Sequence, residues 1–229
     1  SVKDLLEQSE EQLQAQPMEG KFKGDIIITP DCLNSIIDYY TRVFLRDGVL
    51  ISGSSPFKDR LNERVAGDKF TLHSNPLSDE IADGYFITGD GYVAENLTII
   101  DSGVLNSFLL SQYGANKTSL ERAKNSGGAY IIEPGERPLT EIIKNIDRGI
   151  LLARFSGGNP GPNGDFTGVA KNSFYIEEGE IRNPLTETMI AGNLADLFMS
   201  IKDISSERIN FGSAVMPWIC SAGVTISGK

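Results

Sequence analysis

Residues 22–44 read as a buried strand followed directly by an amphipathic helix. Ile26, Ile27 and Ile28 stand side by side, and such a run of branched residues is typical of a strand that is buried on both faces. Thr29-Pro30-Asp31 then supplies an N-cap, a first-turn proline and a first-turn acid. Helical spacing continues up to a stop at Gly48, through Leu33, Ile36, Ile37, Tyr40, Val43 and Phe44. We therefore expect a sheet that has apolar side chains packed against both of its faces.

Two hairpins are expected further along. The first joins 95–100 to 104–110 through Asp101-Ser102-Gly103, where glycine can take the left-handed position. The second joins 173–176 to 181–185 across the acidic turn 177–180. Hairpin connections imply antiparallel pairing, so much of the sheet is expected to be antiparallel.

Other elements complete the expected pattern. Helices are expected at Leu139 to Ile146 and from Leu194 to Ile201, and residues 49–67 give no clear signal. Further strands are expected at 69–72, 150–155, 214–220 and 223–227. We predict an α+β fold, with a largely antiparallel sheet, hairpins and several packed helices, in one domain over residues 1–229. An amphipathic leading helix is expected within residues 1–20.

Composition narrows the classes of function. With 229 residues, 40% of them hydrophobic, the chain can bury one large core or two modest ones. Its net charge is −10 and it has no basic block, which argues against nucleic-acid binding. Apolar runs reach about six residues, against the roughly 20 that span a bilayer. The two cysteines fit a reducing cytosol, so we expect a cytoplasmic protein.

Common catalytic patterns are incomplete. A zinc hydrolase needs two or three imidazole or thiolate ligands, but the chain has a single histidine, His73, expected as a hydrogen-bonded side chain at a strand end. Cys32 and Cys220 have no neighbouring ligand and are expected to be buried, and Gly-x-Ser-x-Gly is absent. The Gly-rich loop 157–165 opens a strand, so it is read as a surface loop and not as a phosphate cradle. The acids Glu177, Glu178 and Glu180 are read as a solvated turn.

Several motifs in the last third resemble one known family. Asp165-Phe166-Thr167, the hairpin around Glu177-Glu178-Gly179-Glu180, and Met189-Ile190-Ala191-Gly192-Asn193-Leu194 follow one another with the order and spacing of the TldD/PmbA proteins, also called modulators of DNA gyrase. Residues 101–111 and 212–223 resemble other parts of that family. The resemblance implies the fold of its C-terminal domain and a preceding N-terminal domain.

The resemblance also implies a comparison with zinc metalloproteases. Family members that hold zinc carry His-Glu-x-x-x-His on one helix and a distant Cys as third ligand. The equivalent helix, 35–44, contains no histidine, and the position expected for the cysteine has Phe211. No catalytic or metal-binding residue is therefore carried over to this chain, which most resembles the PmbA/TldE-type subunit. Zinc is expected on a TldD-like partner, and no cofactor is expected on this chain.

A strand-to-helix corner at Ala191-Gly192-Asn193 is the remaining feature. Gly192 allows a turn or a close approach, and Asn193 can cap the helix from Leu194. The corner is read either as purely structural or, with Asp165, Phe166 and Thr167, as the border of a peptide cleft shared with a partner. Such a cleft can bind an unfolded peptide through its main chain.

Three functions stay open on the sequence. In the first, the chain is the non-zinc subunit of a protease that processes or degrades unfolded peptides, and it contributes dimer surface and peptide cleft. In the second, it is a hydrolase with an unrecognised site that involves Cys220 or His73 with a carboxylate. In the third, it is a homo-oligomeric peptide-binding scaffold without protease activity.

Overall fold

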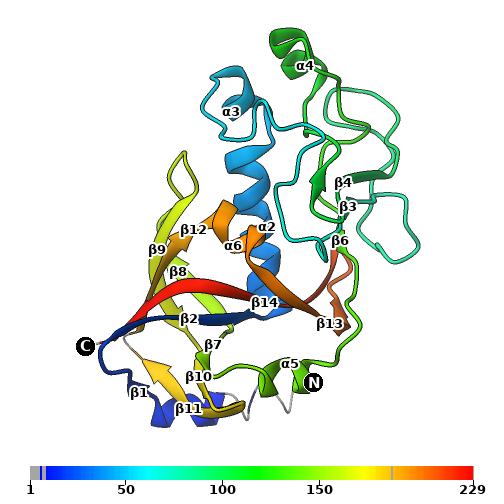
Figure 1. The fold of residues 1–229 in the computed structure, drawn as a ribbon. Coiled ribbons are helices and arrows are strands. Elements are labelled where there is room, and N and C mark those ends of the chain that lie inside the picture. Colours follow the sequence, from blue (N-terminus) through cyan, green and yellow to red (C-terminus); the bar gives the residue numbers. More distant parts are fainter. Residues whose placement is uncertain (1–5, 7–8, 187, 229) are drawn as a thin grey trace.

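A computed structural model describes Leu6 and residues 9–186 and 188–228, and its strands form one large mixed sheet (Figure 1). The helices are η1 (Gln12–Gln14), α2 (Pro30–Phe44), α3 (Asp47–Ile51), α4 (Gln112–Thr118), α5 (Leu139–Lys144) and α6 (Leu194–Met199). The strands are β1 (Gln16–Pro17), β2 (Lys21–Ile28), β3 (Leu72–Ser74), β4 (Leu97–Asp101), β5 (Val104–Leu105), β6 (Tyr130–Ile132), β7 (Arg148–Leu152), β8 (Arg154–Gly157), β9 (Asp165–Lys171), β10 (Ser173–Glu177), β11 (Glu180–Thr186), β12 (Thr188–Asn193), β13 (Ile201–Asn210) and β14 (Ala214–Ser227).

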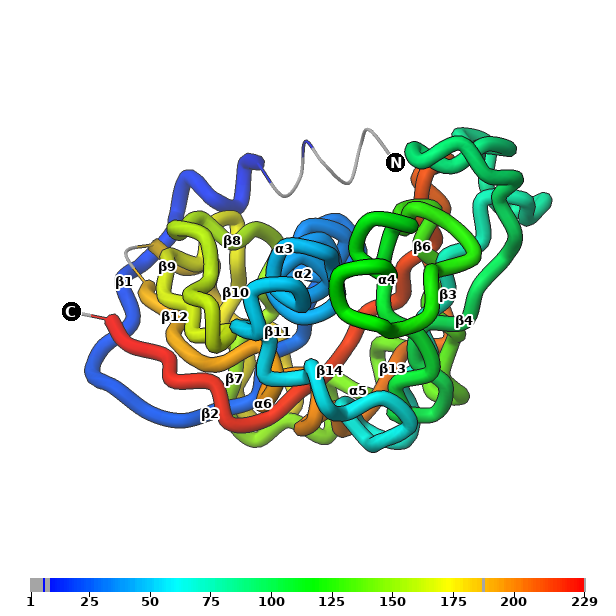
Figure 2. The backbone as a smooth tube through the Cα atoms, turned by 90° about the horizontal axis from the view of Figure 1, so that it is seen from above, coloured from blue at the N-terminus to red at the C-terminus, as the bar shows by residue number. Residues whose placement is uncertain are grey.

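The longest strand, β14, organises the sheet. Its first half pairs antiparallel with β13, and its second half lies between β2 and β12, again antiparallel (Figure 1, Figure 2). The main path of the sheet runs β1-β11-β10-β7-β2-β14-β6-β3-β4-β5. Most strand pairs of the sheet are antiparallel, and the parallel ones are β1 with β11, β2 with β7 and β14 with β6. The prediction of a largely antiparallel sheet is confirmed.

The three consecutive isoleucines of β2 are buried on both faces, as predicted. Ile26 and Ile28 pack into the main core with α2, whereas Ile27 points to the other face. There it joins Ile142 and Ile146, which belong to α5 and the residues after it. Side chains alternate across a strand, so two helices cover the two faces of one strand.

The predicted helix after β2 begins where expected but ends earlier. Thr29 holds the N-cap position with extended backbone, yet its hydroxyl donates to the Ala153 carbonyl at 3.4 Å instead of capping the helix. Gly48 was predicted to stop this helix and does not. The α2 helix ends at Phe44, and Gly48 lies inside the short helix α3.

Aromatic side chains form the centre of the core between α2 and α6. The Tyr40 ring lies 5.0 Å from Phe44 and 4.4 Å from Phe198, measured between ring centroids. Phe57 stacks on Phe44 at 4.4 Å, and Phe70 meets Phe198 edge-on at 5.1 Å. These contacts fix α6, and with it the corner at its start, against α2.

Both predicted hairpins are present, and several strand boundaries differ. Val104 pairs with Asp101 across the first turn, where Gly103 has a φ of +83°, and β10 pairs with β11 across the second. The two strands expected after residue 214 are one strand, with a register shift between Ser221 and Val224. The strand expected at 150–155 divides at Ala153 into β7 and β8. The strand expected at 69–72 begins only at Leu72.

The expected leading helix falls partly on residues outside the described ones. In the described part, residues 9–14 are helical, and Gln16–Pro17 already pairs with β11, so the helix does not extend to residue 20. Among the described residues, no helix is both long and apolar enough to cross a bilayer.

Candidate functional site

The predicted corner residues lie on two strands that pair in register. Asp165 is opposite Asn193, Phe166 is opposite Gly192, and Thr167 is opposite Ala191 across β9 and β12. Residues that lie 24 to 28 positions apart in sequence therefore meet in one antiparallel ladder. The end of β12 runs straight into α6, which makes the strand-to-helix corner predicted from the sequence.

Asn193 connects the two strands and the helix. Its side-chain oxygen accepts from the Ala195 N–H at 2.9 Å and from the Asp196 N–H at 3.4 Å, which confirms the predicted N-cap. Its amide nitrogen donates to the Asp165 carboxylate and to the Asn163 carbonyl, both at 2.9 Å. One side chain thus caps the free N–H groups at the start of α6 and is hydrogen-bonded to the loop that precedes β9.

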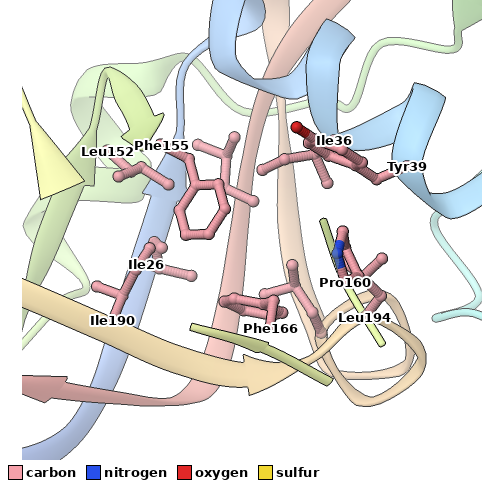
Figure 3. A pocket seen from close by; sticks show the side chains of 11 residues that line it. Ile26, Ile36, Tyr39, Leu152, Phe155, Pro160, Phe166, Ile190 and Leu194 are labelled. Atoms are coloured by element: carbon pink, nitrogen blue, oxygen red, sulfur yellow. The ribbon is translucent and has the colours of Figure 1, made fainter. Parts of the chain in front are cut away.

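Gly192 leaves room for the ring opposite it. A Cβ atom at this position would lie 3.0 Å from Phe166 Cζ, so the aromatic ring lies directly over the glycine. The prediction that glycine allows a close approach here is confirmed. The ring continues into a wholly apolar cavity, where Phe166 meets Phe155 edge-on at 5.7 Å (Figure 3).

This apolar cavity lies between α2 and the strands that curve around it. It is lined by Ile26, Ile28, Ile36, Tyr39, Leu152, Phe155, Pro160, Phe166, Ile190, Leu194 and Leu197. Its free volume is about 20 Å³, little more than one water molecule needs. The cavity therefore belongs to the core and is too small to take a peptide side chain.

A larger, polar recess opens where β12 leaves β14. Asp165, Gly192 and Asn193 line it together with Asp196 and the β14 segment 222–225, and its volume is about 350 Å³. Thr167 is exposed but lines neither this recess nor the cavity. Three of the five predicted site residues thus share one recess, Phe166 belongs to the apolar side, and Thr167 stands apart. We call the space lined by Asp165, Asn193 and 222–225 the polar recess.

The pKa of the Asp165 carboxyl is lowered mainly by its hydrogen bond from Asn193 and secondly by one from Asn163. A lowered folded-state pKa means that the contribution of Asp165 to stability is present at neutral pH and is lost as pH falls through that pKa. We expect Asn193→Ala to raise the pKa toward its ordinary value, and Asn163→Ala to raise it less. Carboxyl chemical shifts followed by NMR during an acid titration measure both changes. An unchanged pKa in Asn193→Ala would refute the assignment.

The exposed face of α2 is where the family resemblance places the metal donors of zinc-holding relatives. This face presents Ser35, Asp38, Tyr39 and Arg42. Within the described part of the chain, no group of three or more His, Cys, Asp or Glu side chains is placed to hold a metal ion. Phe211, at the expected third-ligand position, lies in the turn between β13 and β14.

The two thiols are buried in different places. Cys32 belongs to the main core, and Cys220 packs with Ile27 and Trp218 on the opposite face of the sheet. Burial raises the pKa of each thiol to about 12. The nucleophilic thiolate is therefore scarce at neutral pH, which weakens the idea of a cysteine nucleophile.

We expect neither thiol to react quickly with a disulfide reagent in the folded protein at mildly alkaline pH, because each is buried and protonated. Unfolding in guanidinium restores an ordinary thiol pKa, and both cysteines then react. The absorbance of the released thiolate follows the reaction. Ser54→Cys, at an exposed loop position, is the positive control. Rapid labelling of the folded wild-type protein would contradict the burial.

His73 is hydrogen-bonded, as predicted, but it is the middle residue of β3 and does not lie at a strand end. Its Nδ1 lies 2.9 Å from Thr98 Oγ1, and its Nε2 lies 3.0 Å from Glu133 Oε1. These partners come from β4 and from the residue after β6, which flank β3 on its two sides. The imidazole thus bridges three neighbouring segments and does not meet either cysteine.

Comparison with known proteins assigns the fold to a family. A family profile described as the PmbA/TldA metallopeptidase C-terminal domain matches residues 21–228, nearly the whole chain. The chain belongs to the PmbA/TldD family. A metalloprotease of Methanothermobacter thermautotrophicus is 26% identical over 209 residues, which are 86% of this chain and 45% of that protein. The metalloprotease PmbA of Escherichia coli O157:H7 is 28% identical over 188 residues, 76% of this chain and 41% of that one.

Solved structures of PmbA/TldD proteins share the fold. A candidate modulator of DNA gyrase from Bacteroides thetaiotaomicron superimposes with a TM-score of 0.90 at 25% identity, covering 99% of this chain and 52% of its own. TldE from Thermococcus kodakarensis gives 0.85 at 22%, covering 99% and 55%. The chain thus spans about half the length of these relatives. The resemblance inferred from the corner motifs is confirmed.

Sequence reasoning missed several residues around the corner. Pro160 and Tyr39 border the apolar cavity, and residues 222–225 form one wall of the polar recess. Pro160 lies in the Gly-rich loop, which was interpreted only as surface. Gly223, with a φ of +81°, marks the register shift of β14 and was the available signal for that wall.

Proposed function

We propose that this chain is the non-zinc, PmbA/TldE-type subunit of a cytosolic metalloprotease that processes or degrades unfolded peptides. One observation carries the proposal. The helix expected to hold the metal donors presents serine, aspartate, tyrosine and arginine, and the chain's single histidine is bound elsewhere, between Thr98 and Glu133. Zinc and the hydrolytic step would then reside on a TldD-like partner in a hetero-oligomer.

The corner would contribute part of the peptide cleft. The polar recess has room for an extended backbone, and its wall at 222–225 lies where β12 and β14 separate. Strands that separate leave main-chain donors and acceptors, which can pair with an extended peptide of any sequence. Gly192 would hold this border in position through its contact with Phe166, and Asn193 would do so by capping α6.

A co-expression experiment tests the proposal. The protein is produced with the family member from the same genome that carries His-Glu-x-x-x-His, the complex is isolated by size exclusion, and cleavage of an unstructured peptide is measured with and without a chelator. We expect chelator-sensitive cleavage by the complex and none by this chain alone. Failure of the two chains to associate would refute the subunit role.

Two matched variants test the role of the polar recess in that assay. Ala191 lines the recess, and Met189 lies on the same face of β12 outside its lining and is 46% exposed. We expect Ala191→Phe to reduce cleavage about tenfold, the equivalent of one or two lost main-chain hydrogen bonds, and Met189→Phe to leave it unchanged. Equal activity of both variants would refute the recess as a peptide site.

A further inference from the structure

A second recess lies along the exposed side of α2 and is unusually basic for a chain of net charge −10. It is lined by Ser35, Asp38, Tyr39, Arg42 and Arg46, and its volume is about 400 Å³. Arg42 belongs to the last turn of α2 and Arg46 immediately precedes α3, and both line this one recess. We call this space the arginine recess.

The two guanidinium groups are held in place without an acidic partner. Arg42 lies over the Tyr39 ring at 4.8 Å, and Arg46 Nη2 donates to the Tyr130 hydroxyl at 3.3 Å. Neither arginine has a carboxylate within 4.0 Å in the part of the chain that the structure describes, although many other surface cations do. Arg46 Nε is buried there without a hydrogen-bond partner.

The charge balance in the arginine recess favours an anion. Two full positive charges face the single carboxylate of Asp38 and the C-terminal end of α2, which is equivalent to about half a negative charge. The sum remains positive. Guanidinium N–H groups donate to carboxylate oxygens as they do to phosphate oxygens, so a carboxylate of a peptide is an anion that these two groups can bind.

The arginine recess adjoins a predicted part of the cleft. Tyr39 lines both this recess and the mouth of the apolar cavity, where Pro160 and Phe166 also lie (Figure 3). Tyr39 and Arg42 lie three positions apart on α2, a rise of about 4.5 Å along the helix. About two extended residues cover that distance, so one peptide can touch both places.

We propose that Arg42 and Arg46 bind a carboxylate of the peptide that the protein handles. That the ligand is a peptide rests on the proposed function. The arginine recess itself is a different surface from the polar recess. The carboxylate comes either from the peptide's C-terminus or from an Asp or Glu side chain. Such a site would orient the peptide along α2 toward β9.

Calorimetric titration with short peptides of Ala, Ser and Leu tests the proposal. One peptide has a free C-terminal carboxylate, the second has a C-terminal amide, and the third is the amide with one internal Glu. We expect at least one of the two carboxylate-bearing peptides to bind about tenfold more tightly than the plain amide, and added salt to reduce the difference. Whichever carboxylate-bearing peptide binds more tightly than the plain amide identifies the source of the carboxylate.

Variants separate this site from peptide binding in general. Arg42→Gln and Arg46→Gln are each expected to remove the advantage of the carboxylate peptides, and Lys58→Gln, an exposed cation elsewhere, is the control for net charge. Arg42 makes no side-chain hydrogen bond to any residue that the structure describes, so its variant decides the result even if Arg46→Gln is unstable. If all peptides bind equally, or the advantage survives Arg42→Gln, the site is refuted and peptide handling stands. If no peptide binds, the proposed function fails as well.

Discussion

Phe198→Ala is expected to lower the free energy of unfolding by about 4 kcal/mol, because it removes a fully buried ring and leaves a cavity. Phe198 is 2% exposed and touches both Tyr40 and Phe70. Its helix, α6, has only six residues, which is too short to be stable without tertiary packing. Chemical denaturation followed by tryptophan fluorescence measures the loss.

A matched control separates this effect from a general intolerance of truncation. Phe211 is 39% exposed in the turn between β13 and β14, and Phe211→Ala should cost about 0.5 kcal/mol or less. Because Leu197 borders both the apolar cavity and the polar recess, loss of α6 packing should also disturb the corner. Similar losses in the two variants would contradict the account of α6.

Gly164→Val is expected to cost about 3 kcal/mol, for two physical reasons. Gly164 has a φ of +91°, which an L-residue with a side chain adopts at a cost of about 1–2 kcal/mol. A Cβ atom there would also lie 2.6 Å from Phe44 Cζ, and overpacking costs about 1–3 kcal/mol. The Gly164 carbonyl accepts from the Leu194 N–H at 2.9 Å, so the strain reaches the corner directly.

Gly158→Val, in the same Gly-rich loop, is the matched control. It has no heavy atom within 4 Å of an added Cβ and no left-handed φ, so the variant should be close to wild type in stability. Thermal unfolding of the two variants measures the contrast. If both glycines tolerate valine equally, the loop is not held against α2 in the way the contacts indicate.

The local elements of the fold were largely predictable from the sequence. The isoleucine run of β2 predicted its burial on both faces, and the turns at Gly103 and Gly179 predicted the two hairpins. These signals are local, because strand alternation and turn chemistry act over a few residues. The strand β13, in contrast, reads as polar, because half of its ten residues are exposed and its buried residues include Asp203 and Ser205.

The assembly of the site was less predictable, because it depends on distant pairings. The cap made by Asn193 followed from its place before Leu194, but its bond to Asp165 joins residues 28 positions apart. The register of β14 against β2 joins opposite ends of the chain. Hydrophobic patterns show which face of a strand is buried and do not show which strand lies beside it.

The central claim is that this chain holds no catalytic zinc and depends on a partner that does. Metal analysis tests this claim most directly. The protein is purified alone, dialysed against a weak chelator, and analysed for zinc by mass spectrometry, with peptidase activity measured on the same sample. The account predicts far less than one zinc per chain and no cleavage until the zinc-bearing family member is added. One tightly held zinc per chain, together with chelator-sensitive cleavage by the protein alone, would contradict it.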